Sequence, residues 1–306
     1  MARCFVTREL PGPALDRLRA RHDVEVWSER LPPSAEQLAD RAGDAAGLLS
    51  LVTDRVDAAL IEGCPDLRAI ANYAVGYDNV DVEAASARGI PVGNTPDVLT
   101  DATADLTFAL ILAIARRLED AAAAVKDGEW RTWEPDKYLG HDVHGATLGI
   151  IGMGRIGRAV ARRAAGFEMT VLHTSRDGVA LDELLTSSDF VSLHCPLTPE
   201  THHLIDAETL AKMRPTAMLI NTARGPIVDQ RALRDALVDG TIAGAALDVT
   251  DPEPLAPDDP LMSAPNLIVV PHIGSATHQA RADMATLAVE NLLAALDGRP
   301  MPHEVR

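Results

Sequence analysis

Three side chains of this 306-residue sequence are suited to acid–base chemistry on a small anion, and two of them lie a few residues after an apolar run. Arg224 comes after the apolar run 218–220, His272 comes after the run 269–270, and Glu253 lies between them in the sequence. An arginine can bind a planar carboxylate through two parallel hydrogen bonds. A histidine titrates near neutral pH and can transfer a proton. Because ligands of open α/β sheets bind at the carboxyl ends of the strands, we predict that these side chains form one catalytic set.

Each of these residues also has an ordinary structural interpretation. Arg224 could cap a strand end, Glu253 could be a solvated turn residue between two prolines, and His272 could be a satisfied structural histidine. The surrounding sequence Pro-His-Ile-Gly-Ser-Ala favours the catalytic interpretation of His272. Three other histidines lack such a context, and we expect them to be structural or surface residues: His194, His202 and His203.

A glycine-rich turn of the GxGxxG type follows a strand pattern and opens a helical stretch. Its glycines are Gly152, Gly154 and Gly157. In dinucleotide-binding βαβ units the first glycine permits the tight turn, the second lets the backbone approach a pyrophosphate, and the third lets the helix pack on the strand. We expect the amides of Arg155 and Ile156 to point at the phosphates from the helix N-terminus. The alternative is a glycine-rich turn without a ligand.

The choice of dinucleotide depends on the end of the next strand. Ser175 occupies the position where an NAD site usually carries an acidic residue, and Arg176 follows it. A hydroxyl and a guanidinium suit a 2′-phosphate, so the sequence favours NADP(H). Asp177 could instead turn inward and bind the ribose of NAD, and Arg176 could be an ordinary surface residue. Both alternatives stay open.

Short apolar runs that alternate with helical patterns indicate the elements that position these residues. Such alternation is typical of βαβ units and a parallel sheet. It occurs twice, and we predict an α/β protein of two domains, with a final amphipathic helix at 280–296 returning to the first. Between the two series, residues 100–126 are expected to form one long helix. The predicted boundaries are 1–98 with 279–306 for the first domain and 99–278 for the second.

The composition excludes several classes of partner. The chain has 28 basic and 45 acidic side chains, a net charge of −17, and only 3% aromatic residues. We therefore expect no nucleic-acid surface, no membrane docking and an aliphatic core. The cysteines Cys4, Cys64 and Cys195 show no paired spacing, so neither a disulfide framework nor a metal site is expected. Without a signal peptide pattern, the expected compartment is the cytoplasm.

Several motifs in order along the chain make it resemble the D-isomer-specific 2-hydroxyacid dehydrogenase family, and most closely its glyoxylate/hydroxypyruvate reductase branch. The resemblance rests on the segments 74–81, 94–96 and 152–157 and on the segments around Arg224, Glu253 and His272. It implies a flavodoxin-like substrate domain and a Rossmann cofactor domain with a doubly wound parallel sheet. The stretch between Arg176 and Leu181 is shorter than in most members, where a longer loop and an extra strand often lie.

The resemblance also implies roles. Arg224 holds the substrate carboxylate and polarises the keto oxygen, His272 protonates that oxygen as hydride arrives from nicotinamide C4, and Glu253 stabilises the imidazolium. The implied substrate contacts are the amides of Val75 and Gly76 and the side chain of Leu51. Besides the glycine turn and residues 175–177, the implied cofactor contacts are Thr103, Cys195, Pro196, Thr222, Ala223 and Asp248. We expect Cys195 to be a packing residue rather than a nucleophile.

The implied reaction is NAD(P)H-dependent reduction of a small 2-keto acid, such as glyoxylate or hydroxypyruvate, to the D-2-hydroxy acid. Phosphoglycerate, a longer 2-keto acid or phosphite remain alternative substrates. A non-enzymatic, NAD(H)-sensing binding protein of the corepressor type is a further alternative, which the complete set of Arg224, Glu253 and His272 disfavours.

Aromatic residues gather in one otherwise polar segment. Trp130, Trp133 and Tyr138 lie within nine residues in a chain with ten aromatics, 3 Trp, 3 Tyr and 4 Phe. Such clustering is typical of interfaces, and we predict a homodimer. The alternative is that this segment covers another part of the same chain.

Overall fold

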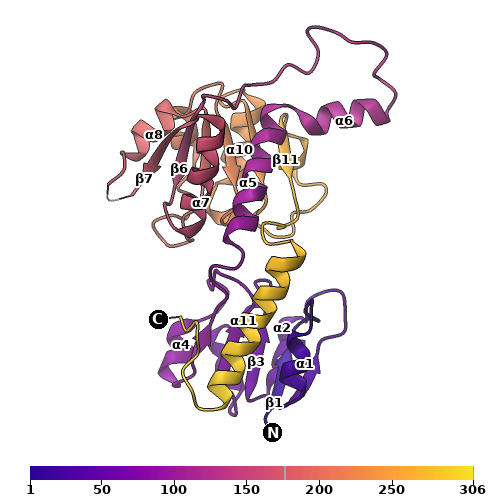
Figure 1. The fold of residues 1–306 in the computed structure, drawn as a ribbon, viewed down its shortest axis with the longest axis vertical. Helices are drawn as coiled ribbons and strands as arrows, with labels where there is room; N and C mark the ends of the chain where they lie inside the picture. The colour runs from indigo at the N-terminus through magenta and orange to yellow at the C-terminus, as the bar shows by residue number, and fades with distance from the viewer. Residues whose placement is uncertain (176, 306) are drawn as a thin grey trace. The chain divides into compact units, whose positions relative to one another are not determined.

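The computed structural model describes residues 1–175 and 177–305. The chain folds into two compact units, Met1–Leu99 with Ala276–Arg306 and Thr100–Ser275. Each unit is built on one parallel β-sheet with helices packed against it (Figure 1). The predicted α/β class with two parallel sheets is confirmed.

The first unit contains five strands in the order β2-β1-β3-β4-β5, all parallel. This is the flavodoxin-like order, in which the connection reverses direction beside β1. The elements in chain order are β1 (Arg3–Val6), α1 (Ala14–Arg19), β2 (Asp23–Val26), α2 (Ala35–Ala42), β3 (Gly47–Ser50), α3 (Ala58–Gly63), β4 (Ala69–Asn72), α4 (Val82–Ala87) and β5 (Val92–Gly93).

The last helix, α11 (His278–Leu296), packs on the sheet of the first unit (Figure 1). Its approach to β3 is close, because a Cβ added at Gly47 would lie 3.1 Å from Cδ1 of Leu292. The hydroxyl of Tyr73 donates a hydrogen bond of 2.7 Å to the carbonyl of Arg281. These contacts join the C-terminal end of the chain to its N-terminal part.

The second unit contains six parallel strands in the order β11-β10-β9-β8-β6-β7. The chain runs from β6 outward to β7 and then returns to β8 on the other side of β6, so the carboxyl end of β6 is the switch point of the sheet. The strands are β6 (Thr147–Ile151), β7 (Thr170–Thr174), β8 (Phe190–Leu193), β9 (Met218–Asn221), β10 (Gly244–Leu247) and β11 (Leu267–Val269).

Helices cover both faces of this second sheet. The α-helices are α5 (Thr100–Ala115), α6 (Leu118–Lys126), α7 (Arg155–Ala164), α8 (Leu181–Ser187), α9 (Ala207–Lys212) and α10 (Gln230–Val238), with 3₁₀ turns η1 (Ala165–Phe167), η2 (Gly225–Ile227) and η3 (Pro260–Ser263). The two cores are aliphatic, and successive residues of β8 enter opposite ones: Phe190 packs with the α5 and α7 side, Val191 with the α9 and α10 side. The strand β7 forms one edge of the sheet, in keeping with the short connection to Leu181.

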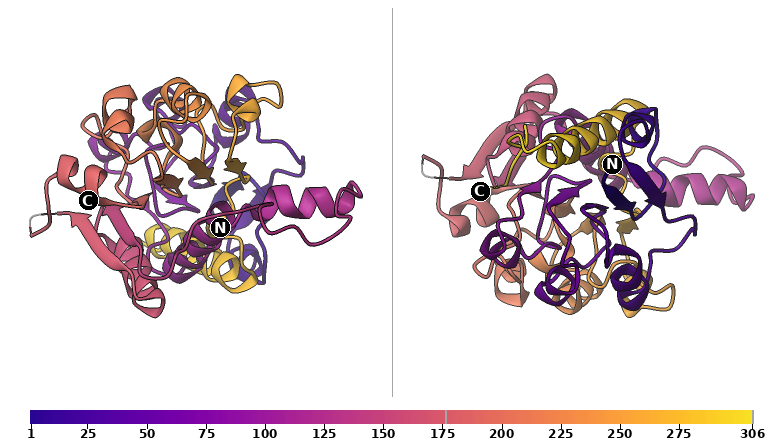
Figure 2. Two further views of the ribbon diagram at one scale, coloured as in Figure 1. Left: turned by 90° about the horizontal axis from the view of Figure 1, so that it is seen from above. Right: turned by 90° about the horizontal axis from the view of Figure 1, so that it is seen from below.

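The prediction of one long helix over 100–126 is wrong. The helix ends at Ala115, and Arg117 adopts the left-handed conformation with a φ of 51° before α6 begins. The amide of His141 takes the carbonyl of Ala115 as its acceptor at 2.8 Å, and a helix that continued would need that carbonyl itself. As a result, α6 leaves the sheet at an angle and projects from the unit with the segment that follows it (Figure 2).

Among the residues that the structure describes, no helix combines the length and the apolar character needed to cross a membrane.

Candidate active site

The backbone around Arg224 is fixed at the carboxyl end of β9. Asn221 donates through Nδ2 to the carbonyl of Arg224 at 2.8 Å and accepts from the amide of Ala223 at 3.0 Å. A Cβ at Gly225 would lie only 1.9 Å from the carbonyl oxygen of Thr250, so only glycine fits at the position after the arginine. The position of Arg224 therefore depends on both its own strand and the segment after β10.

His272 and Glu253 form a hydrogen-bonded pair. Nδ1 of His272 lies 2.5 Å from Oε1 of Glu253, and the two side chains are 29% and 35% exposed. Because Nδ1 faces the carboxylate, Nε2 is the ring nitrogen available for a substrate. The sheet thus brings together two side chains that lie 19 residues apart in the sequence.

Asp248 holds the loop that carries His272. Its carboxylate accepts the amides of Ile273 at 2.6 Å and Gly274 at 2.8 Å, while its carbonyl accepts the amide of His272 at 2.9 Å. Burial raises the pKa of the Asp248 carboxyl, and the hydrogen bond from the Ile273 amide opposes that shift. These bonds hold His272 at a φ of 53°, a conformation that is uncommon for residues other than glycine.

The glycine turn has the geometry that a dinucleotide site requires. Gly152 has a φ of 100°, and a Cβ there would lie 2.5 Å from the amide nitrogen of Cys195. A Cβ at Gly157 would lie 2.2 Å from the carbonyl oxygen of Gly152, which explains why this helix can pack so closely on its strand. A Cβ at Gly154 would meet nothing within 4 Å, so this position leaves open space in front of the N-terminus of α7. A pyrophosphate fits such a cradle, and a side chain would fill it.

The end of β7 carries a small polar cluster. Oγ of Ser175 donates to Oδ1 of Asp177 at 2.7 Å and lies 2.9 Å from Nδ1 of His173. The hydrogen bond from Ser175 is the main reason why the pKa of Asp177 is lowered. Arg176, predicted to bind a 2′-phosphate, lies outside the residues that the structure describes. His173 is a polar neighbour that the sequence interpretation missed, although its place near the end of β7, two residues before Ser175, is a signal for it.

Threonines connect α5 to the end of β9. The hydroxyl of Thr107 donates to the carbonyl of Thr103 at 2.9 Å and lies 3.1 Å from the hydroxyl oxygen of Thr222. A Cβ at Gly274 would lie 3.4 Å from Thr103 and 3.0 Å from the carboxylate of Asp248. The structure therefore gathers Thr103, Thr222 and Asp248, and it adds Thr107, which the sequence interpretation missed.

Two further expected cofactor contacts follow β8. The amide of Cys195 approaches Gly152, and burial raises the pKa of the Cys195 thiol, which keeps it protonated and poorly nucleophilic. The carbonyl of Pro196 accepts the hydroxyl of Thr201 at 2.7 Å and fixes the next turn. His194 lies beside them with its Nδ1 buried, and that burial lowers its pKa to about 3. A neutral, half-buried His194 with its Nδ1 buried agrees with its expected structural role.

The residues expected to contact substrate in the first unit lie at the carboxyl ends of neighbouring strands. Leu51 follows β3, and Val75 and Gly76 lie in the turn after β4. All three residues are half-buried, so each is partly accessible to solvent. Because β3 and β4 are paired and parallel, the two segments leave the sheet at the same edge.

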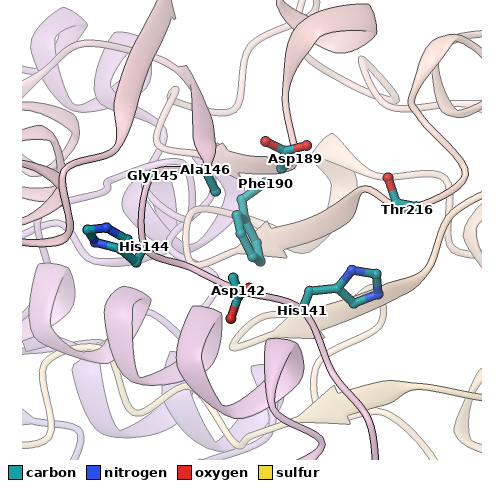
Figure 3. A pocket seen from close by; sticks show the side chains of 8 residues that line it. All are labelled: His141, Asp142, His144, Gly145, Ala146, Asp189, Phe190 and Thr216. Atoms are coloured by element: carbon teal, nitrogen blue, oxygen red, sulfur yellow. The ribbon is translucent and has the colours of Figure 1, made fainter.

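A separate pocket of about 240 Å³ lies at the opposite edge of the second sheet, where β6, β8 and β9 begin (Figure 3). None of the predicted site residues lines it. The rings of His141 and His144 point away from each other in this pocket, and within the described part of the chain no group of three or more His, Cys, Asp or Glu side chains is placed to hold a metal ion. The lining residues are His141, Asp142, His144, Gly145, Ala146, Asp189, Phe190 and Thr216.

A parallel sheet with a GxGxxG turn at its switch point places the second unit in the class of dinucleotide-binding α/β domains. Residues 108–274 match the family model described as "D-isomer specific 2-hydroxyacid dehydrogenase, NAD binding domain". The chain is 48% identical over 316 residues to a glyoxylate reductase of Korarchaeum cryptofilum, covering 99% of this chain and 95% of that protein. The chain therefore belongs to the D-isomer specific 2-hydroxyacid dehydrogenase family, and its cofactor is a nicotinamide dinucleotide.

Solved structures agree with this assignment. The TT0316 protein of Thermus thermophilus superposes with a TM-score of 0.94 at 52% identity, covering 99% of this chain and 100% of that chain. An NADPH-dependent glyoxylate/hydroxypyruvate reductase from Sinorhizobium meliloti, solved in complex with NADP and malonate, has a TM-score of 0.88 at 34% identity, covering 99% of this chain and 96% of that chain.

Proposed function

We propose that this protein reduces a small 2-keto acid, such as glyoxylate or hydroxypyruvate, to the D-2-hydroxy acid with NAD(P)H. The observation that carries the proposal is the 2.5 Å contact between Nδ1 of His272 and Oε1 of Glu253 at the sheet edge that also bears Arg224 and the glycine turn. The glyoxylate reductases among its relatives support the same substrate class. The nicotinamide ring supplies the hydride when the cofactor is bound.

The protein's own contribution is proton transfer and charge stabilisation. We assign His272 as the general acid: its Nε2 proton goes to the keto oxygen, and in the reverse direction the same nitrogen takes the proton back. Glu253 holds the ring through Nδ1 and stabilises the positive charge that the histidine carries before it gives up the proton. Arg224 binds the substrate carboxylate and polarises the keto oxygen next to it.

We further propose that the first unit supplies substrate contacts and the second unit binds the dinucleotide. In this assignment the amides of Val75 and Gly76 receive the substrate carboxylate, and Leu51 lines the substrate site. The dinucleotide contacts proposed beyond the glycine turn are Thr103, Ser175, Arg176, Asp177, Cys195, Pro196, Thr222, Ala223 and Asp248.

We infer a preference for NADP(H) over NAD(H). The absence of an acidic residue at position 175 supports it, and the basic Arg176 is the partner expected for the 2′-phosphate. Asp177 opposes it, because a carboxylate beside a phosphate is repulsive. The Sinorhizobium meliloti relative, which is NADPH-dependent, supports the same preference.

We also propose that the protein is a cytoplasmic homodimer. Trp130 and Trp133 are 69% and 80% exposed on the segment after α6, which projects from its unit. Large exposed aromatic side chains on a projecting segment favour burial against a second copy of the chain.

A panel assay tests the proposed reaction. Oxidation of NADPH and of NADH is followed with glyoxylate, hydroxypyruvate, phosphohydroxypyruvate and a longer aliphatic 2-keto acid, and phosphite is tested with NADP⁺ and NAD⁺. We expect the fastest turnover with the two small keto acids and NADPH. If NAD(H) binds but no keto acid is reduced, the protein is a cofactor-sensing binding protein and the proposal is wrong.

A further inference from the structure

Three successive carbonyl groups in the turn 74–76 of the first unit are each held by a hydrogen-bond donor behind the turn. We call the donors Asn72, Asn94 and Thr95 the carbonyl clamp. The bonds, donor first, are Thr95 N to Ala74 O at 2.9 Å, Asn94 Nδ2 to Val75 O at 2.8 Å, and Asn72 Nδ2 to Gly76 O at 2.9 Å.

The carbonyl clamp determines where the amides of the same turn point. In a planar trans peptide the N–H points opposite to the C=O, and the cis peptide bonds of the described chain lie elsewhere, at Pro252 and Pro254. Holding the carbonyl of Ala74 therefore directs the N–H of Val75 away from the clamp, and holding the carbonyl of Val75 does the same for Gly76. Within the part of the chain that the structure describes, neither amide donates a hydrogen bond.

A second layer of hydrogen bonds holds Asn72 in place. Oγ of Ser50 donates to Oδ1 of Asn72 at 3.1 Å, and Nδ2 of Asn72 also donates to Oδ1 of Asn79 at 3.0 Å. Nδ2 of Asn79 in turn donates to the carbonyls of Leu51 at 3.0 Å and Asp54 at 2.9 Å. The turn after β3 and the turn after β4 are thus fixed by one network.

The backbone of Asn94 is hydrogen-bonded to the C-terminal part of the chain. Its carbonyl accepts Nδ2 of Asn291, on α11, at 2.8 Å, and its amide donates to the carbonyl of His303 at 3.1 Å. Its side chain is therefore available for the carbonyl of Val75. Asn94 is thus held by two backbone bonds and one side-chain bond, and together they fix one orientation of the turn.

We propose that Asn94 is a positioning residue that presets the amide of Gly76, beside the Val75 amide set by the backbone of Thr95, for the carboxylate of the substrate. Asn72 and Asn79 hold the last carbonyl of the same turn. This inference rests on the proposed reduction of 2-keto acids. Donors that are already oriented bind an anion without the cost of ordering a flexible turn, so the carbonyl clamp should set affinity for the carboxylate. Chemistry at the keto group should be affected much less.

Asn94→Ala is the sharpest test, because it removes the side-chain bond to Val75 and leaves the backbone bonds of residue 94 in place. We expect the KM for glyoxylate to rise about five- to tenfold, the value of one lost hydrogen bond. The expected kcat and the Kd for NADPH stay within about twofold. Asn94→Asp keeps the shape but replaces the donor with an anion, so its KM should rise further than that of Asn94→Ala.

Ser34→Ala provides the matched control for simple destabilisation. Ser34 caps α2 in the same unit, where its hydroxyl oxygen accepts the amide of Gln37, and its cap bonds lie within residues 34–37. Loss of the cap costs about 1 kcal/mol of stability. The KM for glyoxylate should not change in this variant, and an equal rise in both variants would overturn the proposal.

Calorimetric binding of oxalate to the protein loaded with NADPH separates failure of the carbonyl clamp from failure of the proposed function. If wild type reduces glyoxylate and Asn94→Ala keeps its KM and its oxalate affinity, the clamp has no positioning role. If wild type binds oxalate without reducing any keto acid, and Asn94→Ala weakens that binding five- to tenfold, the clamp stands and the reaction is wrong. If wild type neither reduces keto acids nor binds oxalate, both are wrong.

Discussion

Nδ1 of His272 lies 2.5 Å from Oε1 of Glu253, and this contact decides which ring nitrogen can meet a substrate. The backbone of His272 is at a φ of 53°, held by the amide bonds of the following residues to Asp248. A strained residue at a site persists only when its surroundings hold it there. The histidine is therefore placed by two carboxylates, one through its ring and one through its loop.

Removal of the His272 ring should abolish most of the turnover and leave cofactor binding nearly unchanged. We expect His272→Ala to lower kcat by about 10²–10⁴, the usual contribution of a positioned proton donor. His272→Asn is the companion variant, because asparagine tolerates a positive φ better than alanine and so preserves the loop. Steady-state kinetics with glyoxylate and fluorescence titration with NADPH measure the two effects. Turnover retained in both variants would remove His272 from the proposed role.

Glu253→Gln should reduce turnover less than loss of the ring does. The amide keeps a hydrogen bond to His272 but does not stabilise the positively charged ring. We expect kcat to fall about tenfold to a hundredfold, on the order of one charge-assisted hydrogen bond. Circular dichroism and NADPH titration serve as controls for folding and cofactor binding. An unchanged kcat would show that Glu253 is only a turn residue.

Two glycines of the same turn should respond differently to alanine. Gly154→Ala is expected to fold normally, since its Cβ meets nothing within 4 Å, but to weaken NADPH binding at least tenfold because the methyl group occupies the pyrophosphate position. In Gly152→Ala the new Cβ would lie 2.5 Å from the amide nitrogen of Cys195, and the residue would have to keep a φ of 100°. The unfolding free energy of this variant should therefore fall by about 2–4 kcal/mol. Urea unfolding and calorimetric titration distinguish the two losses. Equal stability of both variants would contradict the packing argument.

The charges at the end of β7 should set the choice of dinucleotide. Arg176→Ala is expected to raise the Kd for NADPH much more than that for NADH. Asp177→Asn should do the opposite and strengthen NADPH binding, because it removes a carboxylate whose lowered pKa keeps it charged. Titration of each variant with both cofactors gives the ratio of affinities. If Arg176→Ala weakens both cofactors equally, the 2′-phosphate is not recognised there.

Burial of His194 should make stability depend on pH. Its pKa is lowered to about 3 in the folded protein, so between about 6.5 and 3 the unfolded chain binds the extra proton and stability falls as the pH falls. The loss at pH 5 relative to pH 7 is about 2 kcal/mol for this one group. His194→Gln does not titrate, and urea unfolding at the two pH values should show a smaller difference for it than for wild type. Equal differences would mean that His194 is not buried as a neutral ring.

The homodimer is tested through α6. Leu118 and Val125 are 54% and 55% exposed there, and we expect Leu118→Glu with Val125→Glu to shift the protein from dimer to monomer in light scattering after size exclusion. Leu31→Glu is the control, since Leu31 is 75% exposed in the first unit. A wild-type monomer would contradict the proposed assembly.

The parallel α/β architecture and the elements that carry the site can be predicted from the residues alone. Apolar runs of four or five residues, alternating with helical patterns, are fixed by local periodicity, so β6, α7 and the GxGxxG turn between them could be placed from the residues alone. The residue types of Arg224, Glu253 and His272 indicated acid–base chemistry on an anion. Their positions after strand patterns indicated that they share one edge of the sheet.

Other features depend on contacts between residues far apart in the sequence, and these contacts exist only in the folded chain. The helix ends at Ala115 because the amide of His141 donates a hydrogen bond to its carbonyl. The sequence at 116–117 contains no pattern that predicts this bond. Likewise, the clamp bond from Asn94 to Val75 joins the turns after two neighbouring strands. Hydrogen bonds between segments far apart in the sequence have no periodicity, so they are visible only once the sheet has brought those segments to the same edge.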